Sequence, residues 1–153
     1  MINFPINAVH IHLLLNHFPV VLSVIWPVIL VVWLFLNKKE VINTSLFIFI
    51  FVSLLSIPIY FSWGQAAWPV SAVSWVNLQA LVMHYKVATY TFYVLLVLWF
   101  LSILTIYLNW NNNKFKFFYY IVLIFSILVL WWVSLTWYYG WAIRHTEIYD
   151  QAN

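Results

Sequence analysis

Histidine is the residue type in this chain with the chemistry to bind a metal ion or a redox cofactor. Three of the five histidines, His10, His12 and His17, stand close together where the first long apolar segment begins. Imidazole is the commonest side-chain metal ligand at neutral pH, and it also binds haem iron axially. An ionisable group inside a bilayer is costly without a partner, so its presence there indicates function. The other two histidines are His84 and His145.

The other residue types that support redox or metal chemistry are missing or scarce. The chain has no cysteine, which excludes thiolate copper sites, cysteine-ligated iron–sulfur clusters and a C-x-x-C-H haem attachment. Three acidic residues are too few for a carboxylate-bridged di-iron site. No nucleophile–base pair, phosphate loop or acid pair is evident. We therefore expect a subunit of an oxidoreductase complex and not an enzyme that works alone.

The composition predicts an integral membrane protein. Of 153 residues, 67% are hydrophobic and 6% are charged, more apolar surface than a soluble domain of this size could bury. The first apolar segment has no basic n-region and is longer than a usual h-region, so we do not expect a cleaved signal peptide. The net charge of +3 comes from six basic residues that form no cluster, which gives no support for nucleic-acid binding.

Four apolar runs are each long enough to cross about 30 Å of hydrocarbon as a helix. Because apolar residues run continuously and do not alternate, the pattern excludes a β-barrel. The short polar connections imply antiparallel neighbours, so we predict an all-α, integral membrane, up-down four-helix bundle. A single domain covers residues 1–153, with spans at about 13–36, 45–63, 81–108 and 117–141.

The distribution of basic residues predicts the orientation of these spans. Two lysines follow the first span and two more lie between the third and the fourth, against Lys86 and Arg144 on the opposite side. The positive-inside rule then places connections 37–43 and 109–116 in the cytoplasm. Both termini and all five histidines lie on the outer, periplasmic side of the inner membrane in this arrangement.

The depth of the histidines predicts a cofactor site. His17 is the deepest of the first three, and His84 lies about one turn into the third span, on a helix that also starts outside. Two imidazoles from different helices at one level are what a bis-histidine haem b requires, so we expect His17 and His84 to be the axial ligands. His10, His12 and His145 are reserve ligands, and five histidines allow one haem or two.

Three further residues fit a macrocycle near the outer face. Gly64 and Gly140 lie at the level of the histidines, where a residue without a side chain lets a cofactor approach the backbone. A helix C-terminal cap is the alternative role for both glycines. Arg144 is a candidate partner for a haem propionate, and an ordinary solvated helix end is its alternative.

Two other functions fit the same residues. In a cofactor-free accessory subunit, the histidines would hydrogen-bond asparagines and the carbonyl groups that prolines release. A histidine cluster could also bind copper, although Cu(I) sites usually recruit methionine or cysteine, and only two methionines are present. The haem b reading predicts other subunits of a respiratory or oxidoreductase complex as partners, together with a quinone or a periplasmic electron carrier.

Residues 12–19, with the sequence HLLLNHFP, resemble a family of small bacterial predicted membrane proteins, a domain of unknown function. Members carry an H-x(n)-L-x-H-F-P signature that opens four spans, and a histidine at the start of the third span, matched here by His84. The resemblance covers the first three spans and implies a four-span bundle whose histidine pattern is similar to that of haem b membrane anchors. Relatives often have an acidic residue after the third-span histidine. Tyr85 and Lys86 stand here, which argues against proton handling.

Overall fold

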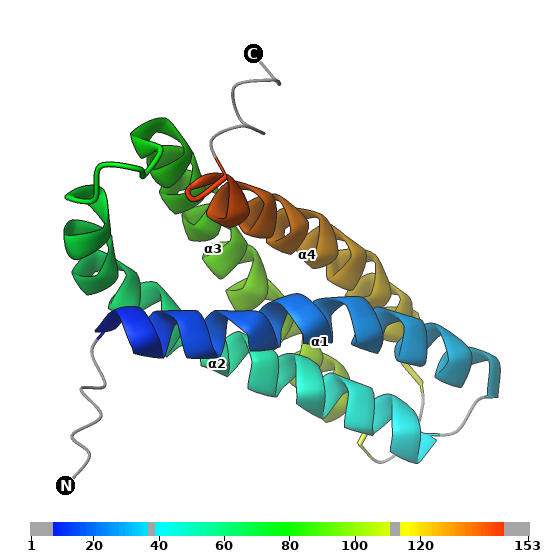
Figure 1. Ribbon diagram of the computed structural model, residues 1–153. Helices are drawn as coiled ribbons and strands as arrows, with labels where there is room; N and C mark the ends of the chain where they lie inside the picture. The colour runs from blue at the N-terminus through cyan, green and yellow to red at the C-terminus, as the bar shows by residue number, and fades with distance from the viewer. Residues whose placement is uncertain (1–7, 37–38, 111–113, 146–153) are drawn as a thin grey trace, which may run out of the picture.

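The computed structural model describes residues 8–36, 39–110 and 114–145. Over these ranges the chain forms four α-helices and no β-strand, which confirms the predicted all-α fold (Figure 1). The two chain ends and parts of the connections 37–43 and 109–116 lie outside the described residues. The helices are α1 (Ala8–Leu36), α2 (Lys39–Ser71), α3 (Leu78–Leu108) and α4 (Phe117–Ala142).

All four helices are long and apolar enough to cross a membrane. The shortest, α4, has 26 residues and is therefore about 39 Å long. Helix α2 extends beyond its predicted span at both ends, and Gly64 lies in its interior instead of capping it. The helix continues through the semi-polar segment because Ala66 and Ala67 are strong helix formers, and Ala66 is buried against the bundle.

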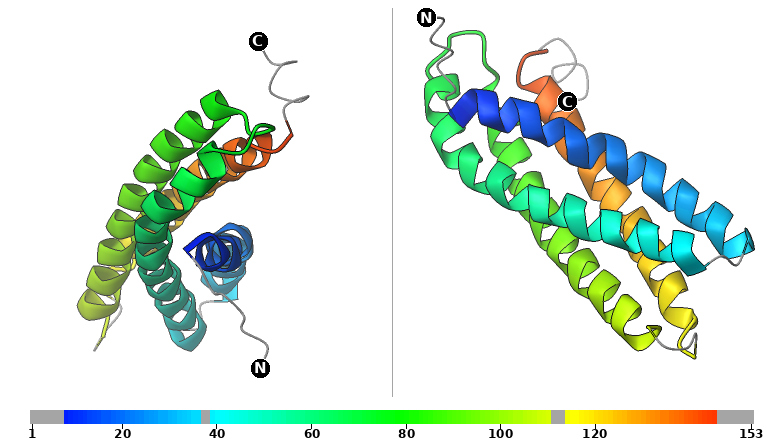
Figure 2. Two further views of the ribbon diagram at one scale, coloured as in Figure 1. Left: turned by 60° about the vertical axis from the view of Figure 1, so that its left-hand side comes forward. Right: turned by 90° about the horizontal axis from the view of Figure 1, so that it is seen from below.

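The helices form a closed ring of neighbours. α1 packs against α2, α2 against α3, α3 against α4, and α4 against α1, with consecutive helices running antiparallel (Figures 1 and 2). The contact of α1 with α4 is less extensive than its contact with α2. The centre of the bundle is filled by aliphatic side chains, among them Leu30, Leu46, Leu98 and Val122.

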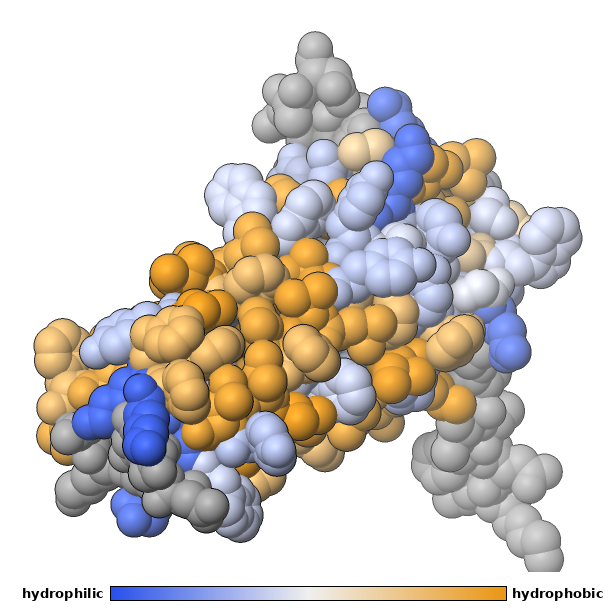
Figure 3. Space-filling view, turned by 180° about the vertical axis from the view of Figure 1, so that it is seen from behind, coloured by the Kyte–Doolittle hydropathy of each residue, from blue (hydrophilic) through white to orange (hydrophobic). Residues whose placement is uncertain are grey.

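Small hydroxyl residues are among the most buried side chains of the bundle. Ser45, Ser53, Ser102 and Ser126 are all buried. Small side chains let two helix backbones approach closely, which is the packing expected where the surrounding medium is itself apolar. The outer surface carries the large side chains instead. On the face shown in Figure 3, apolar side chains cover the middle and hydrophilic ones gather at the two ends.

The turn between α3 and α4 is held by one buried amide. Asn109, 1% exposed, donates through Nδ2 to the carbonyl oxygens of Thr105 and Phe115, at 3.1 and 3.3 Å. Its Oδ1 accepts from the Phe115 N–H at 3.1 Å. This side chain therefore fixes the end of α3 relative to the segment that leads into α4.

We expect Asn109→Ala to lower the free energy of unfolding by about 1–3 kcal/mol, because it leaves buried backbone groups without partners. Reversible unfolding in mixed detergent micelles measures this loss. Ser134→Ala is the control, since Ser134 is exposed and bonds only the Leu130 carbonyl of its own helix. Equal stability of the two variants would contradict the role given to Asn109.

Candidate functional site

A cavity of about 650 Å³ lies among all four helices, at the end of the bundle where α1 begins and α4 ends. Its wall is mainly apolar and aromatic, and its volume is in the range of pockets that hold cofactors and small ligands. His12, His17, His84 and His145 all line it. The predicted gathering of histidines at one end of the bundle is therefore present among the described residues.

The imidazole of His84 is fixed by the backbone of α4. Its Nδ1–H donates to the carbonyl oxygen of Thr136 at 2.9 Å, and the residue is 7% exposed. The Thr136 hydroxyl contacts the Thr91 hydroxyl at 2.7 Å, and Thr91 also donates to the Trp132 carbonyl at 3.1 Å. Because a carbonyl oxygen only accepts, Nδ1 carries the proton and the neutral ring presents a lone pair at Nε2. That nitrogen is the one available as a metal ligand.

His12 is fixed in the same way by α2. Its Nδ1–H donates to the carbonyl oxygen of Ile59 at 3.1 Å, with the Ser62 hydroxyl at 3.3 Å. The residue is 8% exposed. As in His84, the neutral ring keeps its lone pair at Nε2, and the backbone partner sets the ring orientation that metal-binding histidines need.

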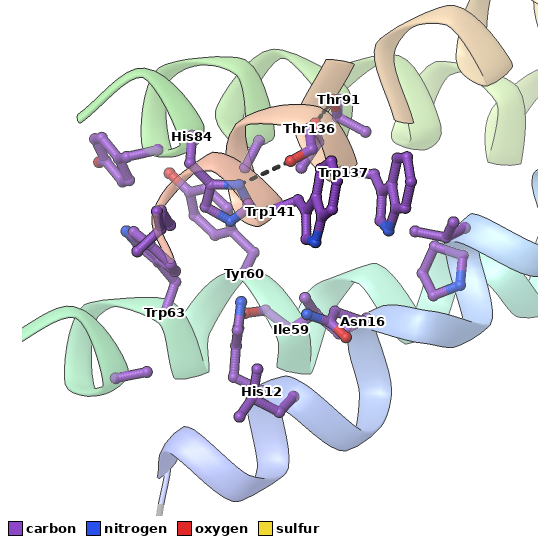
Figure 4. A pocket seen from close by; sticks show the side chains of 18 of the residues that line it. His12, Asn16, Ile59, Tyr60, Trp63, His84, Thr91, Thr136, Trp137 and Trp141 are labelled. Atoms are coloured by element: carbon purple, nitrogen blue, oxygen red, sulfur yellow. Dashed lines mark hydrogen bonds between the residues drawn. The ribbon is translucent and has the colours of Figure 1, made fainter. Parts of the chain in front are cut away.

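The two anchored imidazoles face one cavity from opposite helices. Figure 4 shows His12 on α1 and His84 on α3 pointing toward one another, with ring centroids 6.5 Å apart and planes at 84°. The Trp63 indole, on α2, lies beside both, at 5.3 Å from His12 and 4.8 Å from His84. Trp63 is thus closer to each imidazole than the imidazoles are to each other.

The structure places the other three histidines away from this pair. His17 is exposed and donates its Nδ1–H to the Leu13 carbonyl of its own helix at 2.7 Å. His145 lies against Trp141, with ring centroids 4.7 Å apart. His10 is exposed and is not among the described residues that line the cavity. The pair that the bundle brings together is therefore His12 with His84, whereas the sequence predicted His17 with His84.

The pattern of α1 contains a signal that identifies His12. Large apolar side chains on a membrane helix belong on the lipid side, and small, polar or proline residues belong at helix contacts. Leu14 and Val28, on the same face of the helix as His17, are 70% and 61% exposed. The buried residues recur at spacings of three, four or seven along the other face: His12, Pro19, Ser23, Pro27 and Leu30.

Gly140 makes the position of His84 possible. A Cβ atom at residue 140 would lie 3.1 Å from both Cε1 and Nδ1 of His84, so the ring lies directly on the α4 backbone. Gly64 differs, because no described atom lies within 4 Å of the place its Cβ would take. Of the two glycines that the sequence singled out, Gly140 clears space beside a site histidine and Gly64 does not.

Arg144 lines the cavity just past the end of α4, at the exposed rim that we call its mouth. Its guanidinium lies over the Trp75 ring, with Cζ 5.6 Å from the ring centroid, a cation–π contact. The neighbouring carbonyl of Ile143 accepts from the Asn77 N–H at 3.1 Å, which ties the α2–α3 connection to the end of α4. Arg144 is exposed, so its charge remains available to an anionic group at the mouth.

The site is a pair of histidines and not a larger cluster. Among the described residues, no group of three or more histidine, cysteine, aspartate or glutamate side chains is placed to hold a metal ion. Comparison with protein-family models, with curated proteins and with solved structures finds no match.

We expect Gly140→Ala to lower the free energy of unfolding by about 1–3 kcal/mol, because the added methyl group, 3.1 Å from the His84 ring, makes that ring shift against its hydrogen bond to the Thr136 carbonyl. Gly64→Ala, the matched change in the interior of α2, should instead raise it by about 0.5–1 kcal/mol through helix propensity alone. Unfolding of both variants in the same detergent measures the difference. Equal effects at the two positions would contradict the contact between Gly140 and His84.

Proposed function

We propose that the chain is a multi-pass membrane subunit that binds haem b between His12 and His84 and transfers electrons within a larger oxidoreductase complex. The observation that carries the proposal is the pair of facing imidazoles on α1 and α3, each anchored through Nδ1 to a backbone carbonyl. His12 and His84 would hold the haem iron through these imidazoles, a ligand pair that suits a low-spin haem. When bound, haem b supplies one-electron transfer at this position.

The dimensions of the site support one metal centre between the two rings. The 6.5 Å between the centroids leaves room for one ion with metal–nitrogen distances of about 2 Å to each Nε2. The cavity provides aromatic walls, and Arg144 at its mouth suits a propionate carboxylate. His17 and His145 line the cavity as further polar groups in this proposal, and His10 lies outside it.

A porphyrin centred between His12 and His84 needs the space that Trp63 now fills. The haem proposal therefore requires the half-buried Trp63 side chain to rotate away from the two imidazoles.

The position of Trp63 also favours a second candidate, a single transition-metal ion such as copper held by the same two imidazoles. A single ion needs much less space between the two rings than a porphyrin does, and the ring centroids are 6.5 Å apart. Imidazole is a suitable ligand for copper. The two candidates use the same ligands and differ in what the purified protein absorbs.

The visible spectrum of the protein purified from its native membrane tests the proposal. We expect a sharp low-spin b-type spectrum on reduction with dithionite and a pyridine haemochrome of haem b. His12→Ala and His84→Ala should each abolish it, whereas His10→Ala should leave it unchanged, because His10 is outside the cavity. His17→Ala should retain the low-spin spectrum, since His17 is bonded to its own helix.

Each other outcome changes either the ligand assignment or the cofactor. Loss of the spectrum in His17→Ala but not in His12→Ala would return the ligand role to His17. A colourless protein that contains one copper ion per chain, lost in both His12→Ala and His84→Ala, would favour the second candidate. A colourless, metal-free protein that still folds would leave the histidines as hydrogen-bonding groups of an accessory subunit.

We also propose that the helices cross the inner membrane with the cavity on the periplasmic side. The length and apolarity of the four helices support insertion, and the lysines of the α1–α2 and α3–α4 connections support this orientation. Because the chain has no cysteine, a single introduced cysteine reports its own location. Ser71→Cys, at the cavity end, should react with a membrane-impermeant maleimide in intact cells. Lys114→Cys should react only after permeabilisation, and the reverse pattern would invert the orientation.

A further inference from the structure

The cavity contains a second set of hydrogen-bond acceptors, apart from the histidine pair. Asn16 points into it from α1 (Figure 4), and its Oδ1 is buried with no hydrogen-bond partner among the described residues. A buried carbonyl oxygen without a donor costs free energy, and native structures rarely leave one unpaired. An unpaired acceptor aimed into a cavity indicates a ligand that brings a donor.

The next residue adds an acceptor at the same side of the cavity. His17 lines the cavity, is exposed on the outside of α1, and uses its Nδ1–H on the Leu13 carbonyl. With Nδ1–H used in this way, the other ring nitrogen, Nε2, is the atom of His17 that can accept a hydrogen bond from a donor in the cavity.

Two indoles on α4 form the opposite wall. Trp137 and Trp141 extend from α4 toward α1 in Figure 4, and their rings are parallel within 2°, with centroids 6.1 Å apart. Both are about half exposed, at 55% and 45%. Flat rings favour a planar aromatic ligand, and their N–H groups donate to an oxygen acceptor. The ligand at this wall therefore needs a planar ring and oxygen substituents.

The route to this part of the cavity runs between α1 and α4. These two helices pack against each other less extensively than α1 and α2 do. Exposed residues of both helices line the cavity: Leu13 and His17 on α1, Trp137 and Trp141 on α4. A ligand dissolved in the bilayer can reach the acceptors laterally between these helices.

We propose that a membrane-soluble hydroquinone binds between α1 and α4, with one hydroxyl donating to Asn16 Oδ1 and His17 Nε2 as the second acceptor. The inference rests on the membrane insertion proposed above and adds a lipid-soluble ligand to the same cavity. Hydroxyl donors also occur on glycerolipids. The parallel indole wall fits the planar ring of a hydroquinone and not a glycerol head group.

Equilibrium binding to the full chain in lipid nanodiscs, under anaerobic conditions, tests this site. The probe is a radiolabelled decyl-substituted benzohydroquinone, and empty nanodiscs of the same lipid give the amount that simply dissolves in the bilayer. We expect saturable binding above that background. The dimethyl ether of the same compound, which lacks the donors, and a short-chain diacylglycerol should both bind about tenfold more weakly or worse.

Variants locate the site. Asn16→Leu, of similar size, should weaken hydroquinone binding about tenfold, and His17→Leu should weaken it as well. Asn43→Leu makes the same change near the start of α2, away from the cavity lining, and should bind the probe like the unchanged chain. Circular dichroism of each variant verifies that the helices are intact.

The opposite results overturn the proposal. Equal binding of the hydroquinone and its dimethyl ether would show that the hydroxyl donors do not matter, and equal binding by Asn16→Leu would remove the site. Tighter binding of diacylglycerol would make the ligand a glycerolipid. The same samples are scored for haem by their spectrum, so Asn16-dependent binding by a colourless protein sustains this site while the haem proposal fails.

Discussion

The site depends on two hydrogen bonds, in which the N–H group of an imidazole donates to a main-chain carbonyl of a neighbouring helix. His12 uses Ile59 on α2, and His84 uses Thr136 on α4. An unpaired N–H in an apolar bundle is costly, so each ring is held in one orientation. Both rings line the same cavity in these orientations, with Nδ1 occupied and Nε2 left to other partners. Gly140 leaves room for the His84 ring to reach the Thr136 carbonyl, and the contact between the Thr91 and Thr136 hydroxyls lies beside that bond.

The fold was largely predictable from the sequence, because continuous apolar runs separated by short polar connections allow few other architectures. The exact helix ends were not. Helix α2 runs to Ser71 because burial of Ala66 and the propensity of its alanines outweigh the polar residues around them. The apolar residues of a sequence predict which part of a helix is suited to lipid, but they do not predict the residue at which the helix ends.

The site was predictable in its location and not in its pairing. One end of the bundle collects the histidines that line the cavity, as their positions near helix ends implied. The depth of His17 in the first span favoured it as the partner of His84. The rotation of α1 about its own axis instead places His12 opposite His84. The small and proline residues in register with His12 turn that face inward. The place of Trp63 beside both rings depends on side-chain packing across three helices, which spacing along one chain does not contain.

The pairing of each histidine with its carbonyl has a consequence for assembly. Ile59 is in the same helical hairpin as His12, and Thr136 is in the same hairpin as His84. Each hairpin can thus enter a bilayer during synthesis with its own imidazole already bonded, and neither has to wait for the other. The two-ligand site comes into being only when the hairpins dock. A cofactor bound there would link two hairpins that had each formed their own histidine–carbonyl hydrogen bond beforehand.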